Sequence, residues 1–229
     1  MKIPLKSRKT PSKLICHVNP KSPISEAYRT LRTNIQFVGG PKKIHLLMIT
    51  SAVPGEGKTT TVTNLAIVMA QAGKRVVVVD GDLRKPAIHR IFRLPNHVGL
   101  TSLLRQEVQL SDAVQNIPLI GFDVVPSGPV PPNPTELLST ETMRELLERL
   151  KDQYDIVLLD TPPILPVTDS QVLAAYVDGV LLVLQSGKVL IEQAKKAKAL
   201  LDHVGANVIG SVLNNKKVDR DSYYDYSHD

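Results

Sequence analysis

Residues 52–60 read Ala-Val-Pro-Gly-Glu-Gly-Lys-Thr-Thr. They lie between the apolar run 45–49 and a stretch from Thr59 onward whose composition suits a helix. A glycine-rich loop between a strand and a helix is typical of a phosphate-binding P-loop, because backbone N–H groups and the positive end of the helix can face one anion together. One position differs from the usual pattern, since Ala52 stands where the first glycine normally is. The stretch predicts that the chain binds a nucleoside triphosphate.

The polar residues of this loop each have a chemical use. The ammonium of Lys58 would lie between the β- and γ-phosphates, and the hydroxyl of Thr59 would ligate the Mg²⁺ ion that neutralises them. Asn214 or Asn215, at the end of the last expected strand, would contact the nucleotide base. The residues that we expect at the nucleotide are Val53, Pro54, Gly55, Glu56, Gly57, Lys58, Thr59, Thr60 and Asn214.

Length and composition limit the kind of protein that this chain can be. Its 229 residues suit one large α/β domain. The sequence contains no run of about 18 apolar residues and no apolar signal region at its start, so we expect a cytoplasmic protein. The single Cys16 permits no internal disulfide, and without a cluster of Cys and His we do not expect a structural zinc site.

The net charge of +6 comes from one end of the chain. Its first thirteen residues hold five basic side chains and no acidic one, so the remaining body is close to neutral. Such an arm is a solvated tail, or it binds an anionic membrane surface, a membrane protein or nucleic acid. Nucleic acid is not expected as a partner, because aromatic residues make up only 4% of the chain and cannot form a base-stacking platform.

Short β-branched runs alternate with helical spacing along the chain, which predicts an α/β fold with a mainly parallel sheet and helices on both faces. The helix signals are strongest over residues 22–35 and 190–204. We expect a basic flexible arm over residues 1–21, a P-loop domain over 22–218 and a tyrosine-rich flexible tail over 219–229. The expected strands lie near 44–50, 75–80, 120–126, 155–160, 179–185 and 207–213.

Two of these apolar strands end in carboxylates. The segment 156–160 ends in Asp160, which is the arrangement that places an Asp against the waters of nucleotide-bound Mg²⁺. The segment 76–79 is followed by Asp80, and by Asp82 two residues later. Carboxylates this close crowd negative charge that a metal ion would relieve, and one of them would be free to accept a proton from an attacking hydroxyl. The alternative is that these strand ends are structural or form a solvated turn.

Together these segments resemble a known family. Residues 52–60, 76–84 and 156–163 look like the Walker A, Walker A′ and Walker B motifs of the bacterial tyrosine kinases, a branch of P-loop proteins. The Glu-x-x-Arg-x-x-Arg pattern at residues 26–32 and the Pro-rich loop 127–138 are similar to two further segments of that family.

The resemblance implies a P-loop NTPase fold and an ATP-dependent protein-tyrosine kinase with ATP and Mg²⁺ as cofactors. Lys58 and the loop amides would hold the phosphates. Asp82 and Asp160 would hold the water shell of the metal, and Asp80 would accept or orient the phenolic proton, although which Asp is the base stays open. In the family, the helix with the Glu-x-x-Arg-x-x-Arg pattern packs subunits into a homo-oligomeric ring. The residues implied for that contact are Glu26, Arg29 and Arg32.

The last residues of the chain are suited to receive phosphate. Tyr223, Tyr224 and Tyr226 lie among aspartates and serines, a composition that cannot pack into a core. Exposed phenols on such a segment are accessible acceptors, and phosphate would add negative charge that repels the aspartates.

The resemblance also implies partners and a process. The partners would be protein substrates phosphorylated on tyrosine and a membrane-bound activator of the polysaccharide chain-length-regulator type. The activator would recruit the chain to the inner face of the cell membrane. The process would be capsular or extracellular polysaccharide synthesis.

Two other classes of protein share these features. One is an ATPase that positions cell-division machinery or segregates DNA; it would normally carry a second lysine near the start of its P-loop, where this chain has Val53. The other is a nucleotide-gated scaffold with little catalysis, which would bind a membrane partner through the basic arm.

Overall fold

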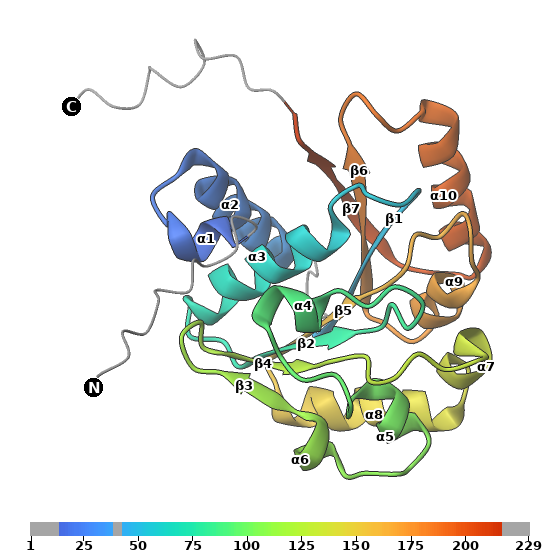
Figure 1. Ribbon diagram of the computed structural model, residues 1–229. Coiled ribbons are helices and arrows are strands. Elements are labelled where there is room, and N and C mark those ends of the chain that lie inside the picture. Colours follow the sequence, from blue (N-terminus) through green and yellow to red (C-terminus); the bar gives the residue numbers. More distant parts are fainter. Residues whose placement is uncertain (1–13, 39–42, 217–229) are drawn as a thin grey trace, which may run out of the picture.

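The computed structural model describes residues 14–38 and 43–216. Within them, one mainly parallel sheet is built from seven strands in the order β3-β4-β2-β5-β1-β6-β7 (Figure 1). Of the strand pairs in residues 14–38 and 43–216, only β3 and β4 pair antiparallel. The strands are β1 (Leu46–Ser51), β2 (Val76–Asp80), β3 (Gln115–Ile117), β4 (Phe122–Val125), β5 (Ile156–Asp160), β6 (Gly179–Gln185) and β7 (Val208–Asn214).

Helices connect most of the strands and cover both faces of the sheet, as expected. Each of them is too short or too polar, among the described residues, to cross a lipid bilayer. They are α1 (Ile15–Val18), α2 (Pro23–Val38), α3 (Lys58–Ala70), α4 (Ile88–Phe92), α5 (Leu100–Leu104), α6 (Leu110–Ala113), α7 (Pro134–Leu138), α8 (Glu141–Gln153), α9 (Asp169–Ala174) and α10 (Ile191–His203).

Alternating side chains of the central strands supply two hydrophobic cores. In β5, Val157 and Leu159 pack on one face of the sheet, while Ile156 and Leu158 pack on the other. Because successive side chains of a strand point to opposite faces, a continuously apolar strand needs cover on both sides. Helices α1 to α4 provide it on one face and α5 to α10 on the other (Figure 1).

Helix α3, which follows the P-loop, is buried nearly all round. Ten of its residues are buried, including the polar Thr61, Thr63 and Asn64. It lies between the sheet and the outer helices α1 and α2 (Figure 1). A helix enclosed on both sides cannot shift easily, so the first turn of α3 has a fixed position.

The structure confirms the six expected strands and both strong helix signals. Ser22 accepts the backbone N–H of Ser25 at 3.1 Å and so begins α2. Gly205, with φ +68°, follows the end of α10. The antiparallel strand β3 was not predicted, because its three residues contain no apolar run.

The packed part of the chain begins earlier than residue 22. Leu14 and Cys16 are 2% and 0% exposed, and they pack against the same core as α3. The basic residues of the first thirteen positions lie outside the described residues.

Core packing yields a first testable expectation. Leu158→Ala should lower the free energy of unfolding by about 2–5 kcal/mol, because Leu158 is fully buried in the central strand and its removal leaves a cavity. Leu119→Ala is the matched control, since Leu119 is 85% exposed and its loss should change stability by less than about 0.5 kcal/mol. Urea unfolding followed by circular dichroism measures both; equal effects would contradict the assigned core.

Candidate nucleotide and phosphoryl-transfer site

The loop that joins β1 to α3 is shaped by two glycines. Gly55 has φ +81° and Gly57 has φ +94°, a conformation that residues with a Cβ rarely adopt. Space is short as well, because a Cβ built on Gly57 would lie 2.0 Å from the side-chain nitrogen of Asn214. Both positions therefore require glycine. A loop of this shape before a helix N-terminus is suited to an anion.

Helix α3 begins directly after this loop and carries the two polar side chains expected at a phosphate site. Lys58, the first residue of α3, is only 9% exposed. The hydroxyl of Thr59 donates a hydrogen bond of 2.7 Å to Oδ2 of Asp160. The first turn of α3 and the end of β5 therefore meet at one point.

Asp80 and Asp160 lie side by side at the ends of two paired strands. They are register partners of β2 and β5, and both are buried, at 0% and 1% exposure. Oδ2 of Asp80 accepts the backbone N–H groups of Ala87 and Ile88 at 3.1 and 3.0 Å. Desolvation raises the pKa of both carboxyl groups. The charge of Asp160 raises the pKa of Asp80 further, while Lys58 opposes the rise at Asp160.

Asp82 is the most accessible of the three carboxylates. It is 9% exposed, and its Oδ1 accepts the backbone N–H of Lys85 at 2.9 Å. The sequence-predicted acids are thus brought together at the carboxyl ends of β2 and β5, next to the P-loop.

Two carboxylate oxygens of this cluster are left for a metal ion, its water ligands or a proton. Oδ1 of Asp80 and Oδ1 of Asp160 are buried and have no hydrogen-bond partner, whereas buried carboxylate oxygens are normally paired. Among the described residues, no group of three His, Cys, Asp or Glu side chains could hold a metal by itself. A Mg²⁺ ion would therefore need phosphate oxygens or water as further ligands, which is its usual coordination at nucleotide sites.

The end of β7 also reaches the P-loop. The side-chain nitrogen of Asn214 donates to the carbonyl oxygen of Glu56 at 2.9 Å. Its Oδ1 accepts the backbone N–H of Asn215, also at 2.9 Å. The side chain of Asn214 therefore holds the backbone of the P-loop. Contact between Asn214 or Asn215 and a nucleotide base stays a prediction.

An ion pair that sequence reasoning missed holds the surrounding loops; the side chain of Arg84 is 38% exposed, whereas that of Asp169 is buried. Arg84 donates to both carboxylate oxygens of Asp169, at 2.8 and 2.9 Å. Thr135 donates to Oδ1 of Asp169 at 2.5 Å, and Asp169 is fully buried. The segment after β2 is thereby tied to the starts of α7 and α9. Arg84 and Thr135 lie in segments that the sequence motifs singled out, but Asp169 belongs to none of them, so no sequence signal predicted this contact.

The three residues implied for a subunit contact all have partners within the chain. Glu26 and Arg29 form an ion pair on α2, and Arg29 also donates to the carbonyl oxygen of Pro20 at 2.7 Å. Arg32 donates to the carbonyl oxygen of Val68, near the end of α3, at 2.8 Å. Glu26 remains 62% exposed in its side chain, so it is the most available of the three.

The expected phosphoacceptors Tyr223, Tyr224 and Tyr226 lie outside the described residues.

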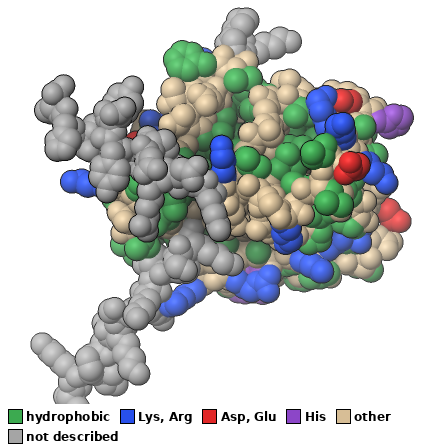
Figure 2. Space-filling view, turned by 90° about the horizontal axis from the view of Figure 1, so that it is seen from above, with side chains coloured by type: hydrophobic (Ala, Val, Ile, Leu, Met, Phe, Trp, Pro, Cys, Tyr) green, Lys and Arg blue, Asp and Glu red, His purple; other side chains and the backbone are tan. Residues whose placement is uncertain are grey.

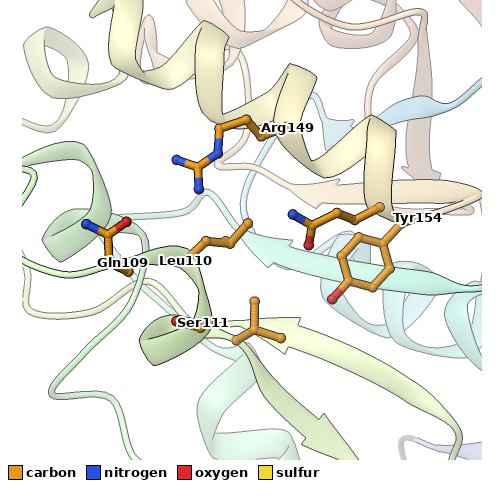
Figure 3. Close-up of a pocket in the computed structure, with 7 residues that line it drawn as sticks. Gln109, Leu110, Ser111, Arg149 and Tyr154 are labelled. Atoms are coloured by element: carbon orange, nitrogen blue, oxygen red, sulfur yellow. The ribbon is translucent and has the colours of Figure 1, made fainter.

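A separate hollow of about 510 Å³ lies between α6 and α8 (Figure 3). Figure 3 shows Arg149 on the α8 side of it and Gln109 and Leu110 on the α6 side. None of its lining residues belongs to the P-loop or to the acidic strand ends. The hollow is therefore distinct from the phosphate site.

Residues 45–204 match the AAA domain family. The tyrosine-protein kinase YwqD of Bacillus subtilis is 49% identical over 213 residues, which are 93% of this chain and 90% of that protein. The chain belongs to the bacterial tyrosine kinase family. Among solved structures, the chimerical protein CapA2B2 aligns with a TM-score of 0.87 at 42% identity, covering 90% of this chain and 91% of that one.

A second solved structure supports the same family. The kinase domain of the Escherichia coli tyrosine kinase ETK aligns with a TM-score of 0.86 at 35% identity, covering 95% of this chain and 88% of that one. The Pyrococcus furiosus cell-division ATPase MinD aligns less well, with a TM-score of 0.64 at 26% identity over 74% of this chain. The P-loop NTPase fold is thus shown, and the tyrosine-kinase interpretation is favoured over the positioning ATPase.

The buried carboxyl groups should make the stability of this kinase family member depend on pH. The folded-state pKa of Asp80 is raised, so the folded protein holds that proton more tightly than the unfolded chain. Without metal, the free energy of unfolding should therefore fall as the pH rises above about 4, the ordinary carboxyl pKa. Asp80→Asn cannot lose a proton and should reduce the fall between about pH 5 and about pH 8 by about 1 kcal/mol or more.

Urea unfolding in EDTA across this pH range measures the slope. Asp152→Asn, at an exposed position of α8, is the control and should keep the wild-type slope. If Asp80→Asn has the same slope as wild type, the raised pKa of Asp80 in the folded protein would be contradicted.

Proposed function

We propose that this chain is an ATP-dependent protein-tyrosine kinase that transfers the γ-phosphoryl group of ATP to tyrosine hydroxyls, including its own Tyr223, Tyr224 and Tyr226. The observation that carries this proposal is the meeting of the P-loop with two buried carboxylates whose Oδ1 atoms lack partners. Family membership supports tyrosine as the acceptor, because the similar proteins are named tyrosine-protein kinases.

Phosphoryl transfer of this kind depends on positioning and on charge neutralisation. Lys58 and the loop amides would hold the β- and γ-phosphates, and the N-terminus of α3 would add its dipole. When bound, Mg²⁺ would neutralise phosphate charge. Thr59 would ligate the ion directly, while Asp82 and Asp160 would orient its water ligands.

The acceptor hydroxyl must lose its proton as the new bond forms. We assign that proton to Asp80, because the pKa of its carboxyl group is raised and one of its oxygens is unpartnered. Asp82 is the other candidate, since it lies closer to the surface. Comparing Asp80→Asn with Asp82→Asn in the transfer step would separate them.

Regulation and partners extend the same proposal. Glu26, Arg29 and Arg32 would contribute to a homo-oligomeric ring in which tails reach neighbouring sites. A membrane-bound activator of the polysaccharide chain-length-regulator type would recruit the kinase to the inner face of the membrane. Phosphorylation would regulate capsular or extracellular polysaccharide synthesis. The division into an arm, a kinase domain and a tail (219–229) belongs to this proposal too, with the start of the kinase domain moved from residue 22 to Leu14, which is buried in the same core as α3.

The first test removes the phosphate cation. Lys58→Met should abolish autophosphorylation, because it removes a charge that stabilises the transition state. Purified protein is incubated with Mg²⁺ and radiolabelled ATP and then probed for phosphotyrosine. Lys196→Met, an exposed substitution on α10, is the control and should label like wild type.

A variant with Phe at 223, 224 and 226 shows where the label goes. It should lose the phosphotyrosine signal while still binding nucleotide, because only the acceptor hydroxyls are missing. Label retained in Lys58→Met would refute the active-site assignment, whereas label retained in the Phe variant would refute the acceptor assignment.

The second test concerns self-association. Replacing Glu26, Arg29 and Arg32 together by Ala should give monomers, because charged groups at an interface fix its register and leave unpaired partners when lost. Thr30→Ala, at an exposed position of the same helix, is the control. Arg32→Ala alone reports the effect of losing the bond to Val68.

Light scattering with Mg²⁺ and nucleotide gives the mass of each variant. A wild type that is monomeric at high concentration, or a triple variant of unchanged mass, would remove the ring from the proposal and leave the nucleotide site intact.

A further inference from the structure

A buried glutamate joins the P-loop to the neighbouring strand. Glu56 is fully buried, and Oε2 accepts the backbone N–H of Val53 at 2.8 Å. Oε1 accepts the backbone N–H of Gln185, the last residue of β6, at 3.0 Å. A carboxylate that accepts two backbone donors holds both segments at a fixed separation. The position of the P-loop is therefore set by the end of β6 as well as by β1 and α3.

The turn that follows β6 is itself well defined. Its backbone N–H groups at Lys188 and Val189 both donate to the carbonyl oxygen of Gln185, at 3.2 Å. The N–H of Ser186 donates to the carbonyl oxygen of Asn214 at 2.8 Å. Gly187 has φ +72° and allows the chain to reverse. The backbone of this turn is thus anchored to the P-loop through Glu56 and to β7.

Lys188 reaches from this turn back onto the P-loop. A Cβ built on Gly55 would lie 3.0 Å from Nζ of Lys188, so the ammonium takes the space that a side chain at Gly55 would occupy. Within the described residues, Lys188 forms no ion pair with an acidic side chain. The turn lies at the top of Figure 1, and the face seen from above carries more Lys and Arg than Asp and Glu (Figure 2).

This placement concentrates positive charge at one loop. Lys58, the N-terminus of α3 and Lys188 all lie at the P-loop, and like charges repel. No ion pair between described residues joins Lys188 to Asp80 or Asp160. A polyanion bound to the loop would relieve this repulsion, so the loop should bind it more tightly than it would without Lys188.

We propose that Lys188 is a second cation of the phosphate site and strengthens the binding of nucleoside di- and triphosphates. The inference rests on the proposed function only in taking the P-loop to bind such a nucleotide. It also answers an observation from the sequence: no second lysine stands at the start of the P-loop, where Val53 is found, but the fold supplies one from the turn after β6. Glu56 acts as the positioning residue of this arrangement.

Nucleotide affinity tests the proposal in the full-length protein. Fluorescent ADP bound in the presence of Mg²⁺ is displaced by unlabelled ADP and by ATP, at low and at high salt. Lys188→Met should raise both dissociation constants about 5- to 20-fold at low salt and weaken their dependence on salt, because one phosphate-facing charge is lost. Lys188→Arg keeps the charge and should stay within about threefold of wild type.

Lys195→Met is the matched control, since Lys195 is exposed on α10 and its loss removes the same charge. It should bind nucleotide like wild type. Urea unfolding of each variant checks that the fold is unchanged, and Lys188→Gln takes the place of Lys188→Met if that variant has an altered midpoint.

The outcomes separate this inference from the proposed function. Equal affinities for wild type, Lys188→Met and Lys195→Met, or equal losses in both Met variants, would overturn the role of Lys188. A selective loss in Lys188→Met supports it, even if the wild type fails to phosphorylate tyrosine and the kinase proposal falls. A wild type that binds no nucleotide would overturn both.

Discussion

Asp80 and Asp160 lie beside each other because β2 and β5 pair in parallel register. Two buried carboxylates in that position repel one another, and burial removes the water that would solvate them. The fold offsets part of this cost from several directions. The N–H groups at the start of α4 face Asp80, while the hydroxyl of Thr59 and the charge of Lys58 act on Asp160. The unpartnered oxygens that remain make the strand ends a place where a cation is favourable.

The position of β1 converts this local excess of negative charge into a polarised site. Because β1 lies between β5 and β6, its P-loop has the acids on one side and the turn with Lys188 on the other. A cation is favoured on the first side and phosphate on the second. Glycines at 55 and 57 make this possible, since the side chains of Lys188 and Asn214 occupy the space where Cβ atoms would be.

Packing links the outer helix α2 to this site. Arg32 of α2 bonds the carbonyl oxygen of Val68, and Val68 belongs to the same helix that begins with Lys58 and Thr59. Tyr28 of α2 is also held near Thr61; its burial raises the pKa of its phenol to about 12. The outer helix α2 is therefore tied to the helix that begins at the P-loop.

The sequence by itself determined the strand–loop–helix order, the mainly parallel sheet and the acidic strand ends. These features depend on local periodicity and on short motifs, so they can be read without knowing which segments meet. The three-residue strand β3 was not predicted, because it has no such pattern. Tertiary structure alone decided which oxygens are unpartnered, that Asp169 holds Arg84, and that Lys188 lies on Gly55. Each of these joins residues far apart in the chain, and their distances follow from strand order and helix packing, which no single segment encodes.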